Sequence, residues 1–163
     1  FNALYCLNRP QVHTLSCGAA RPVDFDTHLD ALAHYDNIEA TIAPIEKRLR
    51  AELSAILGAD WCARWPEGLP HYVDVPGEVN LMEILRLWTY TKGLDMVDWG
   101  KMRYNLLGQG DHWFPGETVA KLDFEKIKSV LEASPFADRI PDILKETHAL
   151  LFDQEQKRLS QSE

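Results

Sequence analysis

The residues best placed to do chemistry lie in one short segment near the start of the chain. Residues 15–29 read Leu-Ser-Cys-Gly-Ala-Ala-Arg-Pro-Val-Asp-Phe-Asp-Thr-His-Leu. This pattern is typical of a short apolar strand, a turn at Gly18 and a helix with Pro22 in its first turn. Such a turn directs backbone N–H groups and the positive end of a helix dipole toward one point. The segment therefore predicts a site for an anion such as a phosphate.

Two other places carry reactive side chains. Asp111, His112 and Trp113 lie in a glycine-flanked stretch, where a neutral histidine beside a carboxylate can act as a base or bind a metal. No second histidine or cysteine stands at metal-ligand spacing, so we favour a loop that its aromatic residues hold on a helical core. Cys17 lies close to a helix N-terminus, which favours the thiolate, but we favour a buried thiol in a strand.

Hydrophobic periodicity predicts that helices form most of the chain. Apolar residues recur at helical spacing in seven segments: 1–8, 22–35, 41–57, 81–92, 96–107, 123–133 and 139–152. Because Pro44 fits only in a first turn, the third helix should begin one or two residues before it. Asn80 and Asp95 are N-cap candidates, and Gly93 is the expected end of the helix that Asn80 begins. Four tryptophans, at 61, 65, 88 and 99, are expected to pack in the core.

One short strand, at residues 12–17, stands alone among these helices. A lone strand leaves unpaired backbone N–H and C=O groups and needs a partner strand. Only 11 residues precede it, too few for the parallel partners and covering helices of an α/β sheet. We therefore expect the chain to be the C-terminal part of a larger α/β enzyme. In the isolated chain the strand should pair with a second copy, pack irregularly or be disordered.

Composition limits the class of protein. The 163 residues carry a formal net charge of −8, which argues against a general nucleic-acid binder. The densest basic cluster, Lys47-Arg48-Leu49-Arg50, is flanked by Glu46 and Glu52 and is typical of a solvated helix face. No apolar run approaches the ~20 residues that span a bilayer. Three widely spaced cysteines argue against a disulfide framework, so reduced thiols in a cytoplasmic protein are expected.

The first part of the chain resembles the end of the aldo-keto reductase barrel. The resemblance is carried by the first helix, the turn Arg9-Pro10-Gln11-Val12, the strand and the segment from Gly18 to Asp24. The resemblance covers about 35 residues. It implies that residues 12–17 are strand eight of a parallel β/α barrel in the complete protein. It also implies that the following loop and helix start hold the adenosine 2′-phosphate of NADPH. The catalytic aspartate, tyrosine, lysine and histidine of that family lie in earlier strands, so the resemblance assigns no catalytic residue to this chain.

The resemblance carries cofactor contacts over to five positions. Gly18, Ala19 and Arg21 fall in the phosphate-facing loop. Asp24 stands where the family usually has glutamine, which places a negative charge near the approaching phosphate. His28, with Thr27 before it, falls where the family has the residues that contact the adenine. The resemblance thus implies NADP(H) as cofactor and a small carbonyl compound as substrate of the complete enzyme.

The second half of the chain is similar to the ferredoxin-like helical extension of some bacterial aldo-keto reductases. Residues 75–81, Val-Pro-Gly-Glu-Val-Asn-Leu, resemble a junction of that extension in which the cysteine is missing. Residues 103–108, Arg-Tyr-Asn-Leu-Leu-Gly, resemble the stretch before its second cluster motif. A [4Fe–4S] cluster needs four thiolates and the chain has three scattered cysteines, so no iron–sulfur cluster is expected.

The sequence therefore predicts three parts: a barrel end at 1–38, a degenerate ferredoxin-like helical extension at 39–153 and a polar tail at 154–163. The function that it favours is the C-terminal part of an NADPH-dependent aldo-keto reductase, itself non-catalytic. The alternative is a non-enzymatic helical module for docking or oligomerisation. We expect neither a nucleic acid nor a membrane as partner, and we expect the isolated chain to self-associate.

Overall fold

The computed structural model describes residues 1–109 and 115–153, and these residues are mainly helical. The chain divides into two compact units, Phe1–Ala51 and Glu52–Glu163. The division falls inside one long helix, α3, Ile38–Leu57. Asp111, His112 and Trp113 lie outside the described residues.

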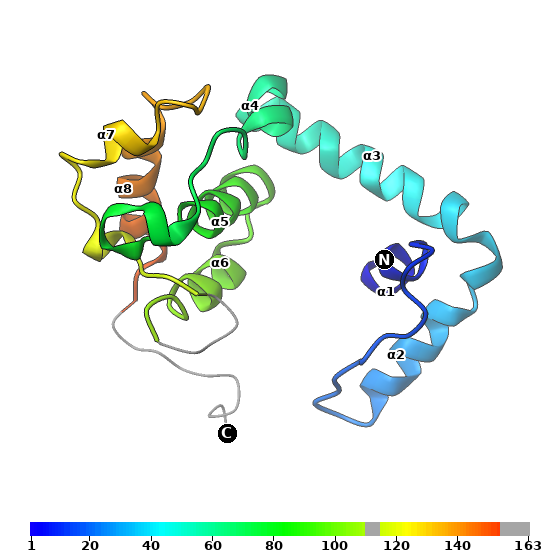
Figure 1. The fold of residues 1–163 in the computed structure, drawn as a ribbon. Coiled ribbons are helices and arrows are strands. Elements are labelled where there is room, and N and C mark those ends of the chain that lie inside the picture. Colours follow the sequence, from blue (N-terminus) through cyan, green and yellow to red (C-terminus); the bar gives the residue numbers. More distant parts are fainter. Residues whose placement is uncertain (110–114, 154–163) are drawn as a thin grey trace. The chain divides into compact units, whose positions relative to one another are not determined.

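Unit 1 (Phe1–Ala51) is built from three helices and a long irregular segment. It contains α1 (Asn2–Leu7), α2 (Val23–Leu32), the short 3₁₀ helix η1 (Tyr35–Asn37) and the first part of α3 (Figure 1). The buried apolar side chains of this unit are few, namely Leu4 and Ile42, each 2% exposed. Unit 1 therefore has little core of its own.

The strand expected at residues 12–17 is not formed in this structure. Residues 12–19 have no regular secondary structure, and no strand or sheet occurs in the described part of the chain. Cys17 is exposed, so the expectation of a buried strand thiol is wrong. The physical reason is the one raised by the sequence: nothing in unit 1 offers the backbone partners that a strand requires.

The apolar stripe of α2 is also not buried. Phe25, Leu29 and Leu32 share one helix face, as the sequence predicts, but each is more than half exposed. No residue of α2 is buried. The spacing was therefore correct for an amphipathic helix, whereas the surface that would cover it is missing from unit 1.

Unit 2 (Glu52–Glu163) holds the main hydrophobic core. Its helices after α3 are α4 (Ala59–Arg64), α5 (Leu81–Leu94), α6 (Val97–Tyr104), α7 (Ile127–Val130) and α8 (Ile140–Leu151). Three short 3₁₀ helices connect them: η2 (Tyr72–Asp74), η3 (Pro76–Glu78) and η4 (Val119–Lys121). Helix α5 contacts both α6 and α8, and these three helices form the centre of the unit (Figure 1).

The sequence of α5 explains its central place. Asn80 caps it, since the Asn80 side-chain oxygen accepts a hydrogen bond from the backbone N–H of Glu83 at 3.0 Å. The apolar side chains expected on one face, Leu81, Ile84, Leu85 and Trp88, are all buried. Helix α8 contributes its own apolar face to the same core, through Ile140, Ile143, Leu144 and Leu151.

The tryptophans contribute to this core as expected. Trp61 is 1% exposed, and its ring lies edge-on to that of Trp88 at 5.0 Å between centroids. The indole N–H of Trp61 donates to the Thr89 hydroxyl at 3.0 Å, which satisfies the buried donor. Trp65 and Trp99 are partly buried against the same core.

Several helix boundaries differ from the prediction. Helix α3 begins at Ile38, so Pro44 lies inside it rather than in its first turn. Ile42, in the turn before this proline, is buried, so the part of α3 that precedes Pro44 is packed in unit 1. Helix α5 continues through Gly93 to Leu94 and ends at Asp95, which has a left-handed backbone with φ of 54°. Asp95 therefore ends α5 and does not cap α6, whose N-cap is Met96.

Candidate functional site

The candidate site is the turn that leads into α2, at residues 18–28. Ala20, Arg21 and Pro22 bring the chain to the helix, and Pro22 stands directly before its first residue, Val23. Proline is suited to this position because its fixed φ matches the helix and it has no N–H to satisfy. The turn is exposed, while the side chain of Asp24 is 27% exposed.

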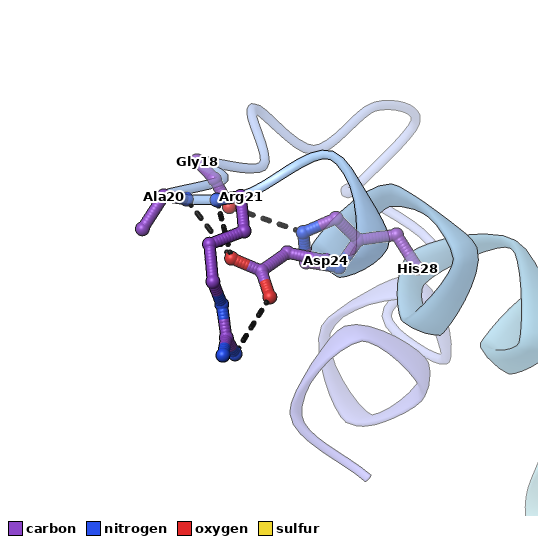
Figure 2. Close-up of polar contacts among 5 residues, drawn as sticks. All are labelled: Gly18, Ala20, Arg21, Asp24 and His28. Atoms are coloured by element: carbon purple, nitrogen blue, oxygen red, sulfur yellow. Dashed lines mark hydrogen bonds and ion pairs between the residues drawn. The ribbon is translucent and has the colours of Figure 1, made fainter.

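The carboxylate of Asp24 accepts hydrogen bonds from the donors of this turn. The backbone N–H groups of Ala20 and Arg21 both donate to Oδ2 of Asp24, each at 3.0 Å (Figure 2). The Arg21 guanidinium forms an ion pair with Oδ1 of Asp24 at 3.3 Å. An acid in the first turn of α2 thus reaches back to the amides before the helix, as the acid of a capping box does.

These contacts stabilise the charged form of Asp24. The hydrogen bond from the Arg21 amide is the largest cause of a pKa below the usual value of an aspartate. The Ala20 amide, the Arg21 guanidinium and the charge of His28 lower this pKa further, and partial burial opposes them. The turn therefore holds an anion, and in this structure the anion is the carboxylate of Asp24.

His28, on α2, contacts the first residue of the turn. A ring nitrogen of His28, Nε2, lies 3.1 Å from the backbone carbonyl oxygen of Gly18, so this nitrogen donates to it (Figure 2). The edge of the same ring lies against Phe25, with centroids 6.4 Å apart. His28 consequently links the first residue of the turn to the second turn of α2.

The structure brings together four of the five residues that the sequence singled out. Arg21 pairs with Asp24 and His28 contacts Gly18, whereas Ala19 is exposed and makes none of these contacts. The sequence did not point to Ala20, whose amide donates to Asp24 at the same 3.0 Å as the amide of Arg21. The available signal was Asp24 itself, because an acid in the first turn of a helix commonly accepts from the preceding amides.

The contacts of this turn are those of hydrogen-bond donors around an anion. It offers two backbone donors and one guanidinium, which together suit a phosphate or carboxylate oxygen. Within the described residues no group of three or more histidine, cysteine, aspartate or glutamate side chains is arranged to hold a metal ion. No helix of the described residues is both long enough and apolar enough to cross a membrane.

Comparison with known proteins gives no relative: no family model, curated protein or solved structure matches this chain. The aldo-keto reductase resemblance therefore stays a prediction.

Proposed function

We propose that this chain is the C-terminal part of an NADP(H)-dependent oxidoreductase of the aldo-keto reductase type. In this proposal residues 12–17 become strand eight once the preceding strands are present, and α2 is the last helix of the barrel. The remaining helices form an extension beside it. The complete enzyme reduces a small carbonyl compound by hydride transfer from the cofactor, with catalytic groups in the earlier strands. Reduced thiols at Cys6, Cys17 and Cys62 suit a cytoplasmic enzyme.

The observation that supports the proposal is the convergence of donors on one anion. The amides of Ala20 and Arg21 and the Arg21 guanidinium all point at the carboxylate of Asp24. The same three donors suit the 2′-phosphate of NADPH, which distinguishes it from NADH. The Asp24 carboxylate and the phosphate therefore compete for this turn, and cofactor binding requires Asp24 to turn away.

A fluorescence titration with NADPH tests the proposal on the full-length polypeptide that contains these residues. Arg21→Ala should weaken NADPH binding about tenfold, because a charge-assisted hydrogen bond to the phosphate is lost. Arg48→Ala is the matched control, since Arg48 is another exposed guanidinium of unit 1 and belongs to α3. The proposal is wrong if the polypeptide does not bind NADPH, or if both variants bind it equally well.

Asp24→Gln tests the competition between the Asp24 carboxylate and the 2′-phosphate, and here the change should strengthen NADPH binding. Glutamine removes the negative charge and leaves the Ala20 and Arg21 amides available to a phosphate. NADPH binding should become tighter, while NADH binding should change little because it has no 2′-phosphate. Equal effects on the two cofactors would show that Asp24 does not face the phosphate.

A second candidate function is a helical module for docking or oligomerisation. The observation that favours it is the exposed apolar face of α2, formed by Phe25, Leu29 and Leu32. The two candidates differ in what covers this face. In the reductase it is the barrel of the same polypeptide, and in the module it is another polypeptide.

A further inference from the structure

Helix α2 of unit 1 exposes large apolar side chains on one face, which is unusual for a helix that faces only water. Phe25, Leu29 and Leu32 are 57%, 63% and 51% exposed and follow one another at spacings of four and three residues. Large side chains at this spacing form one continuous stripe along a helix. A stripe of this kind at the surface marks a face that a partner covers.

Unpaired acids border this stripe. Asp26 and Asp30 are exposed and stand four residues apart, so they share the flank beside Phe25 and Leu29. Within the described residues neither side chain has an ion pair or a hydrogen bond. The covering surface should therefore be apolar and should carry positive charge along one edge.

Helix α3 of the same unit presents a complementary face. Lys47 and Arg50 are exposed, stand three residues apart, and form no ion pair in the part of the chain that the structure describes. Alanines occupy the positions next to them on the same side of the helix, at 40, 43 and 51. These small side chains, before and after the two bases along the helix, leave room for the bulky stripe of α2 beside the positive charge.

We propose that a second copy of this chain covers α2. Phe25, Leu29 and Leu32 of one copy pack against the alanine-lined face of α3 of the other. Asp26 and Asp30 pair with Lys47 and Arg50 of the second copy. Because one chain carries both faces, a two-fold axis forms each contact twice and closes the assembly as a dimer. This inference rests on the second candidate function and names its partner.

Charge reversal tests the pairing without removing any apolar side chain. One variant carries Asp26→Lys with Asp30→Lys, and the other carries Lys47→Glu with Arg50→Glu. Each variant alone places like charges at both contacts, so each should sediment as a monomer. In an equimolar mixture one contact is native and the other is reversed on both sides, so a one-to-one heterodimer should form. Glu132→Lys with Asp138→Lys is the control, since it makes the same change in charge as the Asp26, Asp30 variant, at exposed positions of unit 2.

Sedimentation velocity on the 163-residue chain over a dilution series gives the readout. We expect a dimer for the wild type and the control, monomers for the two reversed variants, and restoration of the dimer in their mixture. A wild type that stays monomeric up to about 1 mM, the weak end of specific association, overturns both the inference and self-association as a function. A dimer that neither reversal disturbs overturns the inference alone, because the chain then associates through other surfaces.

Discussion

Replacement of Tyr104 by phenylalanine removes a hydroxyl that joins three elements of unit 2. Tyr104 belongs to α6 and is fully buried. Its hydroxyl accepts a hydrogen bond from the Val119 amide of η4 at 3.2 Å and lies 2.7 Å from Nδ1 of His148 on α8. The amide N–H uses its own proton in this hydrogen bond, so the hydroxyl proton of Tyr104 can be donated to the imidazole of His148. Burial is the largest cause of the raised pKa of Tyr104, about 12, so the hydroxyl stays protonated.

The expected loss of stability follows from the two groups that lose the tyrosine hydroxyl as a hydrogen-bond partner. The Val119 amide is buried and loses its acceptor, which costs about 1–3 kcal/mol. His148 is only partly buried, so water replaces the tyrosine hydroxyl at Nδ1 at little cost. We therefore expect Tyr104→Phe to lower the free energy of unfolding by about 2 kcal/mol. For a domain of this size that corresponds to a fall of roughly 10 °C in Tm.

Urea denaturation followed by tryptophan fluorescence measures this loss, because Trp61 and Trp88 report on the core beside α5. Tyr90→Phe is the matched control. Tyr90 is partly exposed and its ring contacts Trp99, and removal of its hydroxyl should change stability by less than about 0.5 kcal/mol. If the two variants lose the same free energy, the hydroxyl of Tyr104 does not hold α6, η4 and α8 together.

Three further changes test other parts of unit 2. Asn80→Ala removes the N-cap of α5 and should cost about 1 kcal/mol in urea denaturation; no measurable change would mean that the cap is dispensable. Burial lowers the pKa of His148 in the folded state, so the unfolded state binds its proton first and stability should fall as the pH drops below about 6.5. The wild type should lose more stability on this acidification than His148→Gln, and equal losses would contradict the assignment. Gly68→Ala should cost more than about 3 kcal/mol, because φ is +68° and the new Cβ would collide with the Ala133 carbonyl. Gly58→Ala, also at positive φ but in open space, should cost only about 1–2 kcal/mol, and similar losses for the two would rule out the collision.

The core of unit 2 was predictable because its signals are local. Asn80 followed by Leu81, Ile84, Leu85 and Trp88 contains both the cap and the apolar face of α5, and the structure confirms both. The boundaries of α3 and α5 were less predictable: α3 begins six residues before Pro44, although proline favours a first turn. The sequence placed the end of α5 at Gly93, but the helix continues to Leu94 and the left-handed residue that ends it is Asp95.

Unit 1 shows where local signals are insufficient. The spacing of Phe25, Leu29 and Leu32 correctly predicted one apolar helix face, but a sequence pattern does not say whether a surface exists to cover it. Backbone pairing of residues 12–17 depends on partners in the same way. At the candidate site, the sequence singled out Arg21 and Asp24, but it did not predict that they contact each other. That contact depends on the rotamer of the Asp24 side chain, which the spacing does not determine.

The most direct test of the central claim is the preference of the full-length polypeptide for NADPH over NADH, measured with and without Arg21→Ala. If the turn at residues 18–24 holds the 2′-phosphate, the wild type binds NADPH more tightly, and the variant loses most of this preference while its NADH affinity is unchanged. A preference that Arg21→Ala leaves intact, or the absence of any nicotinamide cofactor binding, would contradict the account.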